Sequence, residues 1–188
     1  MTEEAFLEFL KKRQGLLDAV CVSGGEPTLY PQLPALLRSI KDLGFLVKLD
    51  TNGSDPVMLQ SLVAEGLVDY VAMDIKNAPA RYGETVGLGK VPLEAMEESI
   101  RFLMEGSVDY EFRTTVVQQL HDAASIQQMG QWLAALIPGK KPAKLFLQKF
   151  VDRDTVIFGG LSAPDQAQME AFVSLLAPFV EKISIRGD

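Results

Sequence analysis

The sequence predicts an α/β protein with about six parallel strands joined by crossover helices. Two observations lead to this fold class. Short apolar runs bounded by turn residues alternate with longer segments whose apolar residues recur at helical spacing, and no hairpin signal joins neighbouring strands. Strand-helix-strand repeats give a parallel sheet with right-handed connections, either as an open doubly wound sheet or as an arc of a β/α barrel.

The predicted strands are short, apolar and closed by turn residues, as buried parallel strands are. They are expected over 16–24, 45–52, 68–76, 109–117, 144–150 and 182–187. Helices are expected over 2–13, 33–44, 56–66, 92–106, 122–139 and 164–180, most of them ending at Gly or Pro. The glycine-rich stretch 82–92 fails the phosphate-loop spacing, because Glu84 stands where a Gly is required, and we interpret it as a mobile loop.

Composition points to one soluble, cytoplasmic domain spanning residues 1–188. An apolar content of 47% can fill a substantial core. The 18 basic and 25 acidic residues give a net charge of −7, which argues against nucleic acid as a partner. The sequence shows neither an apolar run of membrane-spanning length nor a signal peptide, so no membrane partner is expected. The lone Cys21 can form no intramolecular disulfide, as expected of a cytosolic protein.

Polar residues cluster where the predicted strands end. They are Ser23 to Glu26, Asp50 to Gly53, Asp74 with Lys76, Arg113, and Gln148 with Lys149. The carboxyl ends of parallel strands carry the site in β/α folds, because their loops converge there. Charges on neighbouring strands are costly unless they pair or meet a polar ligand, so an internal salt network is the structural alternative to a ligand site.

Three strand-end motifs carry a resemblance to a known family. "SGGEPTL", "DTNG" and "MDIK" follow successive strands and resemble the S-adenosylmethionine (SAM) pocket of radical SAM enzymes. Within that superfamily, their order and spacing are most similar to the activating enzymes of glycyl-radical proteins, those of anaerobic ribonucleoside-triphosphate reductase and pyruvate formate-lyase among them. The resemblance implies a partial (β/α) barrel.

The resemblance also implies roles for individual residues. The SAM-binding residues would be Ser23, Gly24, Gly25, Glu26, Pro27, Thr51, Asn52, Asp74, Lys76 and Arg113. Backbone carbonyls at the glycines and the Glu26 carboxylate would receive the ammonium of SAM. Lys76 would reach its carboxylate or ribose, and Arg113 would clamp the carboxylate bidentately. Asp50, Thr51 and Asp74 would form a site for Na⁺ or K⁺.

The cysteine content departs from the family pattern. Radical SAM chemistry needs a [4Fe-4S] cluster held by three thiolates of a C-x-x-x-C-x-x-C loop, whereas this sequence has one Cys. Cys21 lies within a predicted strand and is interpreted as a buried small hydrophobe. We therefore expect either that the first βα unit, which carries the cysteine loop in the family, is missing, or that the chemistry has been lost. In both cases this chain alone would ligate no cluster and would be inactive.

His121 and Gln148 lie outside the three motifs. His121 precedes the helix expected to start at Asp122 and is expected to be a surface or capping histidine. Gln148 stands in the neighbourhood where some activating enzymes place a His near SAM.

The resemblance implies the SAM-binding body of a glycyl-radical activating enzyme, an oxidoreductase. Such an enzyme cleaves SAM reductively to a 5′-deoxyadenosyl radical that takes a hydrogen atom from a glycine of its partner. The partner would be a glycyl-radical enzyme of ribonucleotide reductase or formate-lyase type, and flavodoxin or ferredoxin would donate the electron. Two alternatives stay open: a cluster-free module that binds SAM or another small ligand, and an ordinary TIM-type lyase or aldolase.

Overall fold

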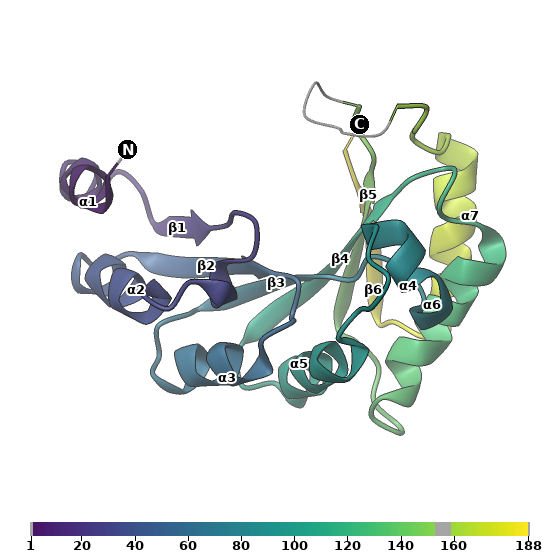
Figure 1. Ribbon diagram of the computed structural model, residues 1–188, viewed down its shortest axis with the longest axis horizontal. Helices are drawn as coiled ribbons and strands as arrows, with labels where there is room; N and C mark the ends of the chain where they lie inside the picture. Colours follow the sequence, from purple (N-terminus) through teal and green to yellow (C-terminus); the bar gives the residue numbers. More distant parts are fainter. Residues whose placement is uncertain (1, 153–158, 188) are drawn as a thin grey trace. The chain divides into compact units, whose positions relative to one another are not determined.

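The computed structural model describes residues 2–152 and 159–187 (Figure 1). The predicted fold class is confirmed: six parallel strands alternate with helices, and the strands follow one another in the order β1-β2-β3-β4-β5-β6. The strands are β1 (Ala19–Val22), β2 (Leu46–Thr51), β3 (Tyr70–Asp74), β4 (Asp109–Val116), β5 (Lys144–Lys149) and β6 (Lys182–Arg186). Each lies inside the segment predicted for it.

The expected helices are also present. They are α1 (Glu3–Lys11), α2 (Leu33–Asp42), α3 (Pro56–Ala64), α5 (Leu93–Glu105), α6 (Ala123–Ala135) and α7 (Gln166–Leu176), with a 3-10 turn η1 (Pro27–Leu29) after β1. Side-chain caps explain where several of them begin: Asp55, Asp122 and Asp165 each accept a hydrogen bond from a backbone N–H in the first turn. None of the helices in residues 2–152 and 159–187 is long and apolar enough to cross a membrane.

One helix was not predicted. Residues 79–86 form α4 (Pro79–Val86), so the prediction of a loop over 82–92 is wrong for its first five residues. Pro79 suits the first turn of a helix, and Gly87 ends it in the left-handed conformation at φ 69°. The side chain of Tyr82 is 2% exposed, and its burial anchors this short helix.

The chain divides into two compact units, and each is described by itself. The first comprises Met1–Met73 and Glu94–Tyr110, and the second comprises Asp74–Leu93 and Glu111–Asp188. The assignment of residues 1–188 to a single domain stays a prediction.

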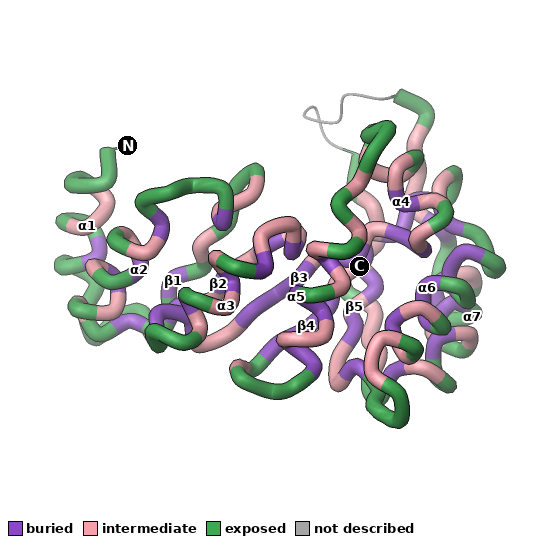
Figure 2. Tube along the Cα trace, turned by 60° about the horizontal axis from the view of Figure 1, so that its bottom comes forward, coloured by how far each residue is buried: buried purple, intermediate pink, exposed green. Residues whose placement is uncertain are grey.

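In the first unit, β1 to β3 bury one face of the sheet beneath α2, α3 and α5 (Figures 1 and 2). Val47, Leu49 and Val71 on that face are 0% exposed. The opposite face carries Cys21 and Lys48, which are register partners. Cys21 is exposed, so the prediction that it is buried is wrong: β1 is an edge strand of the sheet, and the alternation of side chains points Val20 inward and Cys21 outward.

In the second unit, β4 to β6 bury a face against α6 and α7, which pack on each other. Phe112, Leu145 and Leu147 on this face are 0% exposed. The opposite face is polar. There Arg186 makes a two-pronged ion pair with Glu111, at 2.7 and 2.8 Å, and its guanidinium lies 3.3 Å from the centroid of the Phe146 ring. In both units, therefore, the apolar face packs on helices and the other face holds the charges.

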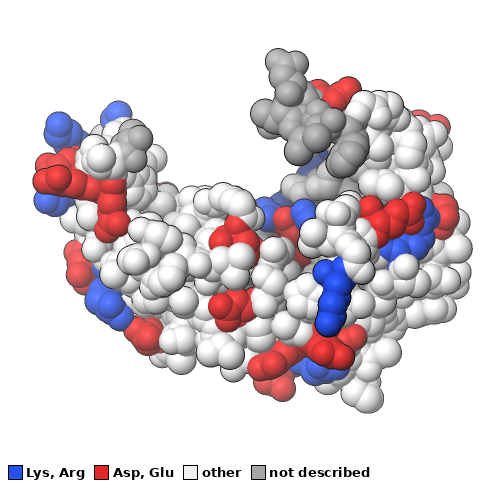
Figure 3. Space-filling view, in the orientation of Figure 1, with Lys and Arg blue, Asp and Glu red and all other residues white. Residues whose placement is uncertain are grey.

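Charged side chains are dispersed over the surface. On the face shown in Figure 3, Lys and Arg lie among Asp and Glu and form no continuous basic surface in the described part of the chain. This distribution fits the net charge of −7 and gives no support to a phosphate-binding role.

Candidate functional site

The residues predicted to form the site fall into two clusters. Ser23 to Pro27 and Asp50 to Asn52 belong to the first unit, and Asp74, Lys76 and Arg113 belong to the second. Most of these residues lie at or just beyond the carboxyl ends of β1, β2 and β3, where the sequence motifs predicted polar groups. Arg113 lies within β4, on the face of the sheet opposite to Phe112.

Glu26 organises the loop after β1. Its carboxylate caps η1 by accepting hydrogen bonds from the backbone N–H of Thr28 at 3.2 Å and from the Thr28 hydroxyl at 2.7 Å. Thr28 is 2% exposed and thus holds the carboxylate at the edge of the core. This local geometry explains why Glu, Pro and Thr stand together in the motif: Pro27 starts the turn and Glu26 caps it.

The same carboxylate joins the first motif to the second. Its Oε1 accepts from the Thr51 hydroxyl at 2.7 Å, and its Oε2 accepts from the backbone N–H of Asn52 at 2.6 Å. Each carboxylate oxygen offers two lone pairs, and Oε1 uses both on the two Thr28 donors and the Thr51 hydroxyl. Within the described residues Oε2 accepts a single one, so it can take a donor from a ligand. The motifs at the ends of β1 and β2 therefore form one connected polar unit.

The glycines of these motifs have two different roles, open space at Gly24 and Gly25 and close packing at Gly53. Apart from the adjoining residues of the chain, a Cβ at Gly24 or Gly25 would have no atom of the protein within 4 Å, so both positions face open space. Gly53 is instead required by packing: its φ is +74°, a Cβ there would collide with Met73, and its carbonyl accepts a hydrogen bond of 2.8 Å from the buried Ser99 hydroxyl. The packing around Gly53 explains the "DTNG" glycine without any ligand.

Asp50 is paired with a residue that the sequence analysis did not single out. Lys48 Nζ lies 2.6 Å from Asp50 Oδ1, and the two side chains are 32% and 17% exposed. Residues two apart in a strand share a face, so the spacing of Lys48 and Asp50 could have predicted this pair. Thr51 is 3% exposed, and its hydroxyl donates a hydrogen bond to the Glu26 carboxylate. The residues in 2–152 and 159–187 contain no group of three His, Cys, Asp or Glu side chains that could hold a metal ion, and the Na⁺ or K⁺ site stays a prediction.

The second cluster is an ion network centred on Asp74. Lys76 Nζ lies 2.8 Å from Oδ2, while Nε and Nη2 of Arg113 both lie 3.0 Å from Oδ1. The side chains of Asp74, Lys76 and Arg113 are 28%, 34% and 13% exposed. Asp74 therefore brings together the two cationic residues that the motifs predicted, in the arrangement that the salt-network alternative required.

His121 is not at the surface. It is 1% exposed, so the expectation of a surface histidine is wrong. It precedes the α6 cap Asp122 and lies beneath α4, an element absent from the sequence prediction. Burial lowers the pKa of the His121 imidazole, and the carbonyl hydrogen bonds that favour the charged form offset this lowering in part.

Comparisons with known proteins place these motifs in context. The model of the radical SAM superfamily matches residues 1–124. A protein of Methanocaldococcus jannaschii described as a candidate glycyl-radical enzyme activating enzyme is 28% identical over 176 residues, which cover 90% of this chain and 70% of that protein. A 7-carboxy-7-deazaguanine synthase of Thermococcus kodakarensis is 32% identical over 141 residues, which cover 74% of this chain and 52% of that one.

A solved structure shows the same fold. A domain of the pyruvate-formate lyase-activating enzyme from Bacteroides vulgatus superposes with a TM-score of 0.72 at 20% identity, covering 91% of this chain and all of that chain. At this level of identity the similarity concerns the fold alone.

Proposed function

Because the chain belongs to the radical SAM superfamily, we propose that its strand-end motifs bind SAM and that it forms the SAM-binding body of a glycyl-radical activating enzyme. When SAM is bound in such enzymes, it is the source of the radical. The following paragraphs concern only what the residues of this chain contribute.

The connection between Glu26 and the "DTNG" motif carries the proposal. The ammonium of SAM needs an anionic acceptor, and Glu26 Oε2 has capacity for one more donor beside the Asn52 N–H. The carboxylate is held by Thr28 and Thr51, both almost fully buried, so its position is fixed before a ligand arrives. The open space at Gly24 and Gly25 would let a ligand approach the main chain. On these counts the first cluster fits the amino-acid end of SAM.

The second cluster supplies cationic donors. An ammonium group has three N–H donors, and Lys76 uses one of them on Asp74 while its side chain stays 34% exposed. The remaining donors suit a carboxylate or a ribose hydroxyl, which is the role that we propose for Lys76. Arg113 shares the Asp74 carboxylate, which orients its guanidinium.

The residues of this chain do not fit an iron-sulfur cluster. A [4Fe-4S] centre that binds SAM needs three thiolates, and the sequence contains one Cys. No step of the proposed function is routed through a cluster held by this chain. The absence of a three-residue metal-ligand group from the described residues favours one second candidate, a module that binds SAM without iron.

The assignment to glycyl-radical activation rests on coverage. The match to the candidate activating enzyme covers 90% of this chain, against 74% for the deazaguanine synthase, although the latter is slightly more identical. The partner proposed on this basis is a glycyl-radical enzyme.

Calorimetric titration with SAM tests the proposal. We expect saturable binding with a Kd in the high micromolar to millimolar range, roughly −4 to −6 kcal/mol, because coordination to iron is lacking. 5′-Methylthioadenosine, which lacks the amino-acid end, should bind at least about tenfold more weakly, since it cannot engage Glu26. Equal affinities for the two compounds would remove Glu26 from the site, and a wild type that never saturates would overturn SAM binding.

A further inference from the structure

The backbone of Lys76 is held on both sides by buried side chains. Its carbonyl lies 2.8 Å from Nε2 of His121, which is 45 residues away in the sequence. Its N–H donates to the phenol oxygen of Tyr82 at 3.1 Å. Tyr82 and His121 are 2% and 1% exposed. The backbone of Lys76, just after β3, is thus held by Tyr82 of α4 and by His121, which precedes α6; we call this pair of hydrogen bonds the clamp.

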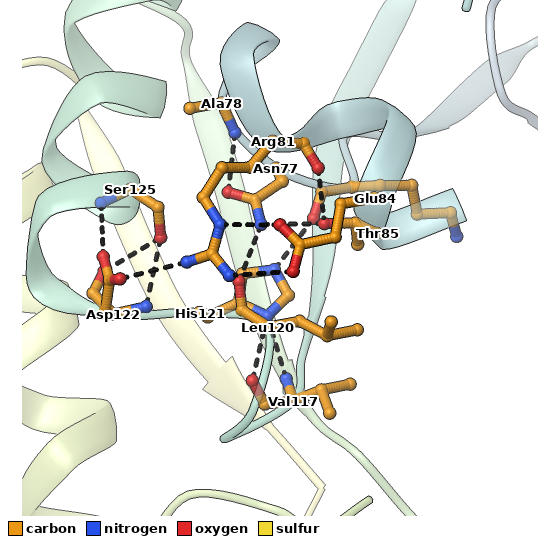
Figure 4. Close-up of polar contacts among 11 residues, drawn as sticks. Asn77, Ala78, Arg81, Glu84, Thr85, Val117, Leu120, His121, Asp122 and Ser125 are labelled. Carbon is orange, nitrogen blue, oxygen red and sulfur yellow. Dashed lines mark hydrogen bonds and ion pairs between the residues drawn. The ribbon is translucent and has the colours of Figure 1, made fainter. Parts of the chain in front are cut away.

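The hydrogen bonds of His121 define its tautomer. Nε2 lies 2.8 Å from the Lys76 carbonyl oxygen, which can only accept, so Nε2 carries a proton and donates to it. Nδ1 lies 3.1 Å from both the backbone nitrogen and the carbonyl oxygen of Val117 (Figure 4), and in a neutral ring protonated at Nε2 it accepts from the Val117 N–H. The lowered pKa of His121 keeps the imidazole neutral near pH 7, and the donor at Nε2 is therefore permanent under those conditions.

Tyr82 is placed for the same task. Its ring packs edge-on against Trp132 at a centroid distance of 6.4 Å, and its hydroxyl also lies 3.4 Å from the Asp74 carbonyl. Burial raises the pKa of Tyr82, so the phenol stays protonated and can accept from Lys76 while its own proton points to Asp74.

Asn77 ties together the segments that carry the two clamping residues. Its side-chain nitrogen donates to the Thr85 hydroxyl in α4 and to the Leu120 carbonyl, at 2.9 Å each. At the surface, Arg81 of α4 pairs with Asp122 at 3.0 Å (Figure 4). Helix α4 and the segment that carries His121 are thereby joined to each other and to the residue after Lys76.

We propose that Tyr82 and His121 are positioning residues that fix the main chain at Lys76 and so place its ammonium on Asp74. The inference rests on the proposed function, since it assigns Lys76 to the ligand site. A lysine has four rotatable side-chain bonds and loses conformational entropy when it is ordered. Fixing the backbone from two sides leaves only the side chain to be ordered, by Asp74, when a ligand binds.

The first test reads the clamp directly. His121 is the single histidine in the sequence, so its imidazole signals in long-range ¹H–¹⁵N spectra need no assignment. We expect a neutral ring with the proton on Nε2 at pH 7.5, and a proton on Nδ1 would overturn the proposal.

The second test compares variants by the intensity of the NMR signal from the Lys76 ammonium. Its NH₃⁺ cross-peak, identified by its absence from Lys76→Gln, should be visible in the wild type and weakened in His121→Leu and Tyr82→Phe. His121→Gln should restore it, because the amide NH₂ can replace the Nε2 donor. Ser174→Ala is the control: it removes a side-chain hydrogen bond within α7 that touches neither Lys76 nor the segments that carry Tyr82 and His121. An unchanged peak in both His121→Leu and Tyr82→Phe would contradict positioning.

SAM affinity separates this inference from the proposed function. Positioning predicts about five- to twentyfold weaker binding in folded His121→Leu and Tyr82→Phe, with His121→Gln and Ser174→Ala near the wild type. Lower melting temperatures with unchanged affinities would reduce both residues to a structural role. If the wild type does not bind SAM but the Lys76 peak still depends on His121, the SAM assignment fails and the clamp stands.

Discussion

Glu26 and Thr51 are joined by a hydrogen bond of 2.7 Å across 25 residues of sequence, between the loop after β1 and the end of the adjacent strand β2. This bond gives Glu26 a structural role in addition to the ligand role implied by its motif. A carboxylate that both caps a turn and anchors the next strand end is held in place before any ligand binds.

Glu26→Gln should therefore lower the free energy of unfolding. The amide keeps one acceptor oxygen and puts an NH₂ group where the carboxylate faced N–H and O–H donors, so at least one charge-assisted hydrogen bond is lost. We expect a cost of about 1 to 3 kcal/mol in urea unfolding. Glu105→Gln, at an exposed position near the end of α5, is the control and should stay within about 0.5 kcal/mol. A wild-type unfolding curve for Glu26→Gln would show that the capping bonds contribute nothing.

Asp74→Asn should also cost stability, because it removes the charge that Lys76 and Arg113 share. The three side chains are 13 to 34% exposed, so water replaces part of the interaction, and we expect about 1 to 2 kcal/mol. Thermal and urea unfolding measure this loss. If Asp74→Asn is as stable as the wild type, the ion network is not a structural element and its charges serve a ligand alone.

Stability should fall as the pH is lowered below about 6.5, the ordinary pKa of histidine. Burial lowers the pKa of His121 in the folded chain, so below pH 6.5 the unfolded chain binds a proton that the folded chain does not. Stability is thus fully present above that pH and is lost as the pH falls toward the folded pKa. Arg81 adds to the lowering, whereas Asp122 opposes it.

Urea unfolding between pH 7.5 and 5 measures this effect. His121→Gln removes the titrating group and should flatten the profile in that window, where the sequence holds no other histidine. An equally steep profile in His121→Gln would place the pH dependence elsewhere.

Reconstitution with iron and sulfide in the absence of oxygen should give no stoichiometric [4Fe-4S] centre on this chain. One thiol, that of the exposed Cys21, cannot replace three thiolates. Iron analysis and electron paramagnetic resonance after reduction provide the readout. Four irons per chain with a reducible cluster signal would contradict this expectation.

The sequence predicted those features that local pattern determines. All six strands follow from apolar runs closed by turn residues. The motif at Gly24 to Pro27 could be recognised because glycine permits backbone conformations that other residues avoid, whereas proline fixes φ. The ion pairs of Asp74 were also foreseeable, since Lys76 follows it by two residues and Arg113 lies in a neighbouring predicted strand.

What sequence reasoning missed depends on contacts between distant segments. The hydrogen bond of His121 to Lys76 joins segments 45 residues apart, and α4, which lies near them (Figure 4), is a short helix stabilised by the packing of the buried Tyr82. Likewise, Cys21 reads as a core residue within an apolar run, and its exposure follows from the edge position of β1, which the run itself does not reveal.

The most direct test of the central claim, that these motifs bind SAM, is a calorimetric SAM titration of the wild type beside Gly25→Ala. A Cβ at Gly25 meets no atom of the protein within 4 Å and its φ is not positive, so the substitution should leave the free energy of unfolding within about 0.5 kcal/mol of the wild type. Gly89→Ala, equally open and without a positive φ, is the matched control.

If a ligand lies against the main chain at Gly25, the added methyl group occupies its space. The account predicts saturable SAM binding by the wild type and by Gly89→Ala, and binding at least about tenfold weaker by an equally stable Gly25→Ala. Identical isotherms for all three proteins, or none that saturates, would contradict it.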